Sequence, residues 1–286
     1  QFIWLLFNCG WAGFWLRLIR PQFTKDIRKM ISRTLPAAVG AGVYQISLLI
    51  DTIIASLLPS GSISFLFFAD RVNQLPLGVV GVAVGTALLP LMSRQLSISD
   101  YKGALDSQNR AIELSLFFTL PAAVGLVLLS EPTISVLFER GAFDAASAKS
   151  TAEALAMYAI GLPAYVVIKA LVPGFFARED TATPVKIAVF SLLINLILNL
   201  ILMDPFLHKG IAAATAISAW CNALGLAFVL KRRGYFSLDK RNTVRLPRMV
   251  VASLLMGVML FFSLIFLNKF FVYETPINLY ILVTLV

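Results

Sequence analysis

The sequence has little of what soluble enzymes and disulfide-rich domains are built from. Of its 286 residues only two are cysteine and one is histidine, and charged residues make up 14%. Cys9 and Cys221 lie far apart in apolar runs, so we interpret both as small buried residues without a disulfide or metal. The sequence also contains no glycine-rich nucleotide loop, metalloprotease helix or Ser-His-Asp order. We therefore expect that this protein is not an enzyme.

Apolar residues are what the sequence has in excess. They form 59% of the chain, against roughly half in soluble domains, and the mean hydropathy is +0.85. The sequence contains several long apolar segments, and their length matches the ~20 residues that a helix needs to cross a membrane. β-strands with unpaired edges cannot cross lipid, because their backbone polar groups would have no hydrogen-bond partners there. The sequence therefore predicts an all-α polytopic membrane protein, a transmembrane helical bundle. Eight segments are predicted, at 2–16, 35–58, 63–91, 111–129, 152–176, 185–203, 210–230 and 249–266, and a ninth begins at Ile277.

The positive charge is distributed unevenly between the loops. Eighteen of the 24 Lys and Arg residues fall in loops on one predicted side, four fall on the other, and Arg71 and Lys169 lie inside segments. Cytoplasmic loops collect Lys and Arg, so the basic side is cytoplasmic. This topology explains the net charge of +9 without a nucleic-acid partner.

Charged residues inside the apolar segments are candidates for function, since each costs about 2.5–3.5 kcal/mol on insertion scales. Asp70 shares one helix face with Asn73 and Gln74, and Arg71 lies beside them. We interpret this turn as the lining of a water-filled cavity, with Arg71 holding an anion through its planar fork. A structural ion pair between helices is the alternative. Lys169 is a further charge in a segment, and it either faces the cavity or snorkels.

A second polar set consists of Asp51, Asn195, Asn199 and Thr215. These residues come from three apolar segments, and Asn195 and Asn199 share one helix face because they are four residues apart. Their oxygen atoms are suitable ligands for a hard cation, as in transporters that hold a coupling ion. Hydrogen bonding between helices is the alternative.

Three blocks of sequence resemble one known family. QISLLIDTIIAS begins at Gln45, GSISFLFFADRVNQLPLGVVGVAVGTALLPLMSR begins at Gly61, and PGFFAREDTATPVKIA begins at Pro173. Their order and spacing are similar to those of the MurJ/MviN family of bacterial lipid II flippases, within the multidrug/oligosaccharidyl-lipid/polysaccharide exporter superfamily. The resemblance implies a multi-pass inner-membrane protein that flips lipid II to the periplasmic leaflet by alternating access, for cell-wall synthesis.

The resemblance also implies that this chain is a C-terminal fragment, without the first lobe and its cavity arginines. Membrane lipids and the missing lobe would then be partners, beside lipid II. The extra helices at the end would form a groove for the lipid tail. The implied parts are 1–19, the end of the last helix of the first lobe; 20–34, a basic cytoplasmic linker; 35–230, the second six-helix lobe; 231–248, a second basic linker; and 249–286, truncated extra helices.

The family pattern implies roles for both polar sets. Arg71 corresponds to a cavity arginine that would meet the lipid II pyrophosphate, while Asp70 would pair across the lobe interface. Some members bind sodium at the positions of the second polar set, although not every member has the carboxylate of Asp51; we expect no other cofactor. The alternatives are another lipid-linked oligosaccharide or multidrug exporter, a precursor-binding scaffold, or a glycosyltransferase that would use Glu131, Glu139 and Asp144.

Overall fold

The computed structural model describes residues 2–11, 13 and 24–267. Over these residues every regular element is a helix, and the one β-type contact is an isolated bridge between Arg140 and Phe143. Six of the described helices are long and apolar enough to cross a membrane. The predicted all-α membrane fold is therefore confirmed. Residues 1, 12, 14–23 and 268–286 of the predicted parts, which include the segment from Ile277, lie outside the described residues.

The chain divides into two compact units, Gln1–Leu35 and Pro36–Val286. Helix α1 (Phe2–Trp11) belongs to the first unit, and α2 (Lys25–Ala55) begins in the first and ends in the second. All contacts discussed below lie within the second unit.

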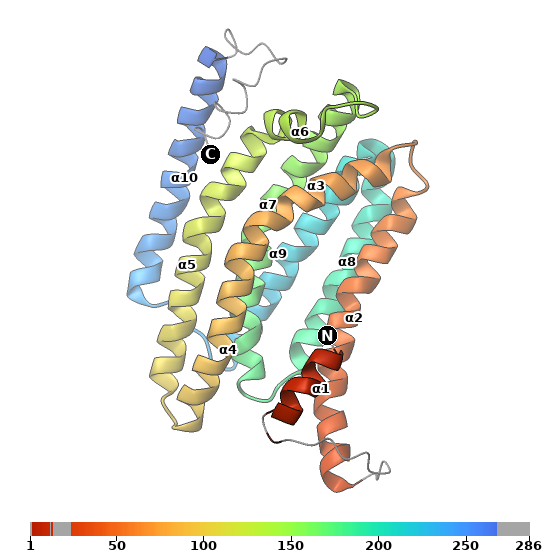
Figure 1. The fold of residues 1–286 in the computed structure, drawn as a ribbon. Coiled ribbons are helices and arrows are strands. Elements are labelled where there is room, and N and C mark those ends of the chain that lie inside the picture. The colour runs from red at the N-terminus through yellow and green to blue at the C-terminus, as the bar shows by residue number, and fades with distance from the viewer. Residues whose placement is uncertain (1, 12, 14–23, 268–286) are drawn as a thin grey trace. The chain divides into compact units, whose positions relative to one another are not determined.

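The second unit is a bundle of helices that run up and down between short turns (Figure 1). A π-helical turn, η1, joins α3 to α4, so that residues 62–97 form one continuous helical span. The short helix α6 was not predicted, because its nine residues were assigned to a loop. The elements are α3 (Ser62–Pro76), η1 (Leu77–Gly81), α4 (Val82–Ser97), α5 (Tyr101–Leu128), α6 (Ser130–Phe138), α7 (Ala145–Phe176), α8 (Ala182–Phe206), α9 (His208–Arg232) and α10 (Lys240–Leu267).

Helix α7 is the centre of the bundle, and it packs against α3, α4, α5, α6 and α9 (Figure 1). Small residues allow these contacts: a Cβ atom added to Gly161 would lie only 3.0 Å from the Cα atom of Ala216 on α9. Small residues commonly let transmembrane helices approach closely. Two hydrophobic clusters flank this contact, one around Leu155 and Ile211 and one around Met92 and Leu171.

The turn between α7 and α8 is fixed by a polar clasp. Asp180 accepts a hydrogen bond from the backbone N–H of Thr183 at 3.0 Å and forms an ion pair with Arg233, at the end of α9. Arg233 also donates to the Thr183 hydroxyl at 3.0 Å. Burial opposes ionisation of Asp180, but the hydrogen bonds of Thr183 and the Arg233 guanidinium outweigh it and hold the pKa of Asp180 below its ordinary value. The clasp therefore joins three helices at the predicted cytoplasmic end.

The alternation of turns makes the predicted topology testable. Ser60, in the turn after α2, and Thr243, on the first turns of α10, are both exposed. In a full-length protein with Cys9 and Cys221 replaced by serine, a cysteine at position 60 should react with an impermeant maleimide added to spheroplasts. A cysteine at position 243 should react only after lysis. The opposite pattern of labelling would contradict the topology.

Helix α10 packs along α5, and a glycine makes this contact close. A Cβ atom added to Gly257 would lie 2.6 Å from Cγ1 of Val124, whereas one added to Gly125 on α5 would meet no atom within 4 Å. We expect Gly257→Leu to lower the stability of the purified protein by about 1–3 kcal/mol, because the side chain overpacks the seam. Gly125→Leu is the matched control and should leave the thermal unfolding temperature equal or higher. Equal destabilisation by both changes would contradict the close α5–α10 contact.

Candidate functional site

The polar turn of α3 holds the first predicted set. The side-chain amide of Gln74 donates a hydrogen bond to the carboxylate of Asp70 one helical turn before it. Asn73 is buried, and its side-chain oxygen has no hydrogen-bond partner among the described residues. The structure therefore brings Asp70 and Gln74 together and leaves a buried acceptor next to them.

Arg71 differs from its neighbours because its side chain is exposed. The guanidinium lies over the ring of Phe67, with 4.7 Å between Cζ and the ring centroid, and it makes no ion pair with any described residue. A permanently charged group at this depth is unstable against lipid tails, so charged residues in spans face a water-filled cavity or another polar surface. Arg71 is therefore placed to meet a ligand or a second part of the protein.

Lys169 on α7 is the second exposed cation within a span. Its aliphatic stem lies beside two glycines of the η1–α4 region: Cβ atoms added to Gly81 and Gly85 would be 3.6 Å from Cγ and 3.9 Å from Cβ of Lys169. At a rise of 1.5 Å per residue, this contact is roughly 15–20 Å further along the continuous helix than Arg71. The two cations thus lie at different depths, and Lys169 forms no ion pair with a described residue.

The second predicted set comes together where α2, α8 and α9 meet. The Asn199 amide nitrogen donates to Oδ1 of Asp51 at 2.6 Å and to Oδ1 of Asn195 at 3.0 Å. Thr215 lies 3.3 Å from Oδ2 of Asp51 and accepts from the Asn195 amide at 3.3 Å. Asp51, Asn195 and Asn199 are each less than 10% exposed. Four polar side chains from three helices therefore form one closed cluster, which we name the Asp51 cluster.

One atom of the Asp51 cluster is not satisfied within the part of the chain that the structure describes. The side-chain oxygen of Asn199, a fully buried residue, has no hydrogen-bond partner there. A buried acceptor without a partner is costly, by about 1–3 kcal/mol. The Asp51 cluster therefore contains a buried oxygen atom that is available to coordinate a bound group.

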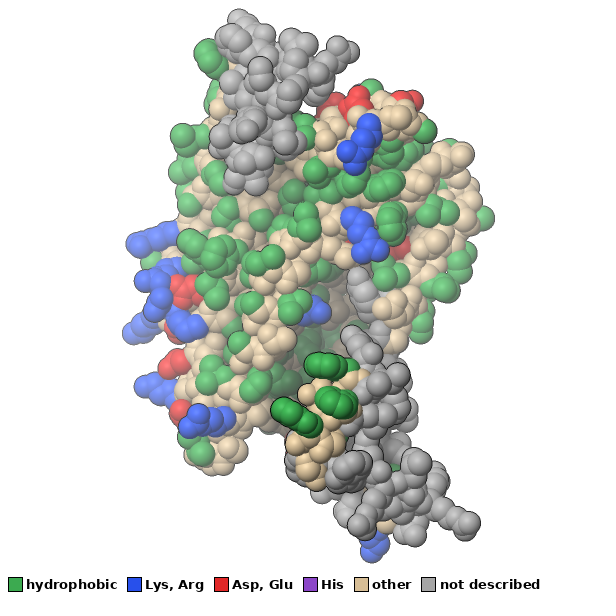
Figure 2. Space-filling view, viewed as in Figure 1, with side chains coloured by type: hydrophobic (Ala, Val, Ile, Leu, Met, Phe, Trp, Pro, Cys, Tyr) green, Lys and Arg blue, Asp and Glu red, His purple; other side chains and the backbone are tan. Residues whose placement is uncertain are grey.

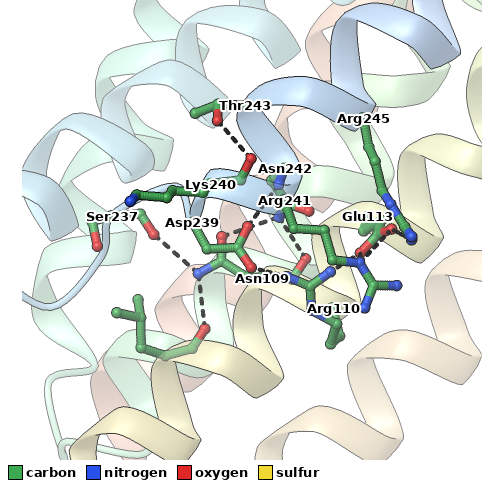
Figure 3. A network of polar contacts seen from close by, with 11 residues as sticks. Asn109, Arg110, Glu113, Ser237, Asp239, Lys240, Arg241, Asn242, Thr243 and Arg245 are labelled. Atoms are coloured by element: carbon green, nitrogen blue, oxygen red, sulfur yellow. Dashed lines mark hydrogen bonds and ion pairs between the residues drawn. The ribbon is translucent and has the colours of Figure 1, made fainter.

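A third polar network was missed by the sequence analysis. It joins α5 to the start of α10 (Figure 3). The Asn109 amide donates to the Ser237 carbonyl oxygen at 3.0 Å, and the Asn242 amide donates to the Asn109 carbonyl oxygen at 3.0 Å. Glu113, whose side chain is 9% exposed, accepts hydrogen bonds from Arg110, Arg241 and Arg245. An acidic residue inside the apolar run AIELSLFF was the signal that could have revealed it.

Comparison with known proteins identifies the family. The sequence profile of the family described as lipid II flippase MurJ matches residues 1–281. The chain belongs to the MurJ family. It is 45% identical over 250 residues to the probable lipid II flippase MurJ of Rhizobium meliloti (strain 1021), covering 87% of this chain and 46% of that protein. The counterpart in Vibrio cholerae serotype O1 is 35% identical, over 84% of this chain and 46% of that protein.

Solved structures agree with the MurJ assignment. A lipid II flippase MurJ in an inward closed conformation superposes with a TM-score of 0.74 at 29% identity, over 93% of this chain and 54% of that one. An outward-facing multidrug resistance transporter of the MATE family, in the MOP superfamily, has a TM-score of 0.64 at 20% identity, over 87% of this chain and 58% of that one, which shows a shared fold. The chain spans about half the length of the curated MurJ relatives it matches.

Membership in the MurJ family identifies the membrane in which this chain lies. It is part of a multi-pass protein of the bacterial inner membrane. The family is one of transporters. Of the acidic residues considered for a glycosyltransferase, Glu131 and Glu139 are exposed, and Asp144 caps α7 by accepting a hydrogen bond from the Ser147 N–H at 2.9 Å. Hydrogen bonds from Ser147 hold the pKa of Asp144 below its ordinary value, which suits a cap and not a general acid.

Proposed function

We propose that the protein containing this chain flips lipid II from the cytoplasmic to the periplasmic leaflet for cell-wall synthesis. The observation that carries the proposal is the exposed guanidinium of Arg71, which makes no ion pair with a described residue, within a membrane span of a MurJ family member. Arg71 would bind the pyrophosphate of lipid II through two parallel hydrogen bonds. The half-buried Asp70–Gln74 pair would line the same surface, next to Asn73, whose buried side-chain oxygen has no hydrogen-bond partner among the described residues.

Lys169 extends this surface toward the cytoplasm. Lys169 is exposed on α7, and its aliphatic stem packs beside Gly81 and Gly85, which lie further along the continuous helix of residues 62–97 than Arg71. A polar head that moves across the membrane would therefore meet a cation at more than one depth. We propose that residues 35–230 form the second lobe, after the end of the first lobe (1–19) and a linker (20–34). The two lobes would shelter the head between them and rock to expose it on alternate sides.

An apolar cavity of about 620 Å³ gives the lipid tail a path outside the polar surface. It is bounded by α5, α7, α9 and α10 and includes Pro163, Trp220, Gly257 and Phe261 in its lining. A polyprenyl chain fits such a lining because it contributes only apolar contacts. We propose that α10, which begins inside the predicted linker at 231–248 and continues into the extra helices at 249–286, holds the tail while the head crosses.

The Asp51 cluster would hold a sodium ion. Oxygen atoms of Asp51, Asn195, Asn199 and Thr215 provide the donor set, and the unsatisfied Asn199 oxygen supports the fit. Rotation of the Asn199 amide by half a turn would direct this oxygen into the cluster, in place of the N–H groups that now bridge Asp51 and Asn195. A cation would neutralise the buried carboxylate and join three helices of one lobe.

Depletion and rescue test the proposed function. A bacterium depleted of its own lipid II flippase should regain growth, and display lipid II on the outer face of its inner membrane, when it expresses the full-length gene. Purified full-length protein should translocate lipid II in vesicles without polymerising it. Rescue of O-antigen display without rescue of growth would point to another lipid-linked substrate, and polymerisation of lipid II would establish a glycosyltransferase instead.

A further inference from the structure

A second cavity lies at the opposite end of the α5–α10 seam from the apolar one. It has a volume of about 590 Å³ and is bounded only by α5 and α10. This end carries the turns assigned to the cytoplasm, and Figure 2 shows Lys and Arg side chains gathered along that edge of the molecule. We name this second cavity the arginine pocket. Its lining consists of Arg110, Glu113, Leu114, Phe117, Arg241, Arg245, Arg248, Met249 and Ala252.

The arginine pocket carries a fixed excess of positive charge. Glu113 lies in its wall and binds Arg110, Arg241 and Arg245, with 2.6 Å from Arg245 Nη1 to Glu113 Oε1 (Figure 3). Asp239, just outside, pairs with Arg110. Four arginines against two carboxylates leave two positive charges in excess. Arg248 forms no ion pair within the part of the chain that the structure describes.

The carboxylate of Glu113 orients the pocket rather than filling it. Its two oxygens hold three guanidinium groups, one from α5 and two from α10, so the arginines are gathered before any ligand arrives. Each guanidinium has five N–H donors, and the ion pairs occupy only part of them. Donors therefore remain for the oxygens of a phosphate, which arginine matches well.

The rest of the lining is apolar and continues up the seam. Leu114 and Phe117 follow the arginine end of α5, and Met249 and Ala252 follow that of α10. The apolar cavity begins further along the same two helices, with Leu120 on α5 and Leu254 on α10. A ligand of the arginine pocket thus has an anionic group at the membrane surface and a hydrocarbon chain directed into the bilayer.

We propose that the arginine pocket binds an anionic phospholipid of the cytoplasmic leaflet, with its phosphodiester among Arg241, Arg245 and Arg248. Basic pockets between transmembrane helices on the cytoplasmic side suit such head groups. The site uses neither Arg71 nor Lys169 and so does not depend on the proposed transport of lipid II. It would hold α10 against α5 through a lipid as well as through protein contacts.

Binding of defined lipids tests the site directly. The full-length protein, purified in detergent, is titrated with dioleoylphosphatidylglycerol and, separately, with dioleoylphosphatidylcholine, and bound lipid is counted by native mass spectrometry. Phosphatidylglycerol should bind more tightly. Arg248→Gln should weaken its binding by roughly fivefold, as expected for one arginine near a phosphate. Arg94→Gln, at an exposed arginine of α4 outside the pocket, is the matched control and should bind as the wild type does.

A second variant separates a lipid from a soluble phosphate. Ala252→Trp fills the apolar half of the pocket without touching its charges, so it should weaken phosphatidylglycerol binding and leave binding of glycerol phosphate unchanged. Equal binding of the two lipids would overturn the proposal, because the pocket would then not select an anionic head group. Equal losses in Arg248→Gln and Arg94→Gln would also overturn it, because they would mean general attraction to a basic surface. Full binding by Ala252→Trp would overturn the lipid as the occupant.

Discussion

Replacing Arg71 with alanine in the full-length protein should abolish rescue of a flippase-depleted bacterium while the protein still accumulates in the membrane. The side chain would lose a charge-assisted hydrogen bond to pyrophosphate, worth about 1.5–3 kcal/mol, or roughly a tenfold to hundredfold loss of affinity. Folding should change little, because Arg71 is exposed and its guanidinium lies over the ring of Phe67 without an ion pair to any described residue. Growth after depletion, together with the amount of membrane protein on a blot, measures the two effects separately.

Two further variants make the Arg71 result specific. Arg71→Lys keeps the charge but loses the planar fork, so it should rescue growth only in part. Arg94→Ala removes another exposed arginine, at the cytoplasmic end of α4, and should rescue fully. Full growth with Arg71→Ala would remove Arg71 from the substrate surface. Equal failure of Arg71→Ala and Arg94→Ala would show a general need for charge.

Hydropathy predicted all six of the long apolar helices that the structure describes, but it placed their ends poorly; the segments predicted at 2–16 and 35–58 are not among the six. The segment predicted at 111–129 is part of a helix that begins at Tyr101, and the segment predicted at 249–266 is part of one that begins at Lys240. Hydropathy detects the length in contact with lipid, whereas a helix continues until its backbone is capped. Asp100 and Asp239 provide these caps by accepting hydrogen bonds from the N–H groups of Gly103 and Asn242.

The polar residues also divide into those that the sequence could reveal and those that it could not. Asp51, Asn195 and Asn199 could be recognised because each is polar within an otherwise apolar run, and their convergence follows from the cost of leaving them unpaired in lipid. The partners of Asn109 and Glu113 near the start of α10 could not be recognised, because they lie more than a hundred residues away. The sequence of that segment indicated only that it is rich in positive charge. Only the packing of α10 on α5 brings these groups together.

Sodium should stabilise the wild-type protein if the Asp51 cluster binds it. A ligand that binds only the folded state adds about 2.7 kcal/mol at a hundred times its dissociation constant. The thermal unfolding temperature of the full-length protein should therefore be higher in sodium chloride than in choline chloride at equal ionic strength. Asp51→Asn should remove most of this difference, because it keeps the size of the side chain and discards the charge that attracts the cation.

Two more variants decide between a cation and simple hydrogen bonding. Asn199→Ala removes the buried oxygen that has no partner among the described residues, so it should also reduce the sodium effect. Asp204→Asn changes an exposed carboxylate on the same helix, α8, and should leave the effect intact. If sodium binds, the ion joins α2 to α8 and α9, and its removal favours whichever state of the transporter separates them. An unfolding temperature that is the same in both salts, or a sodium effect that survives Asp51→Asn, would reduce the Asp51 cluster to hydrogen bonds that hold three helices together.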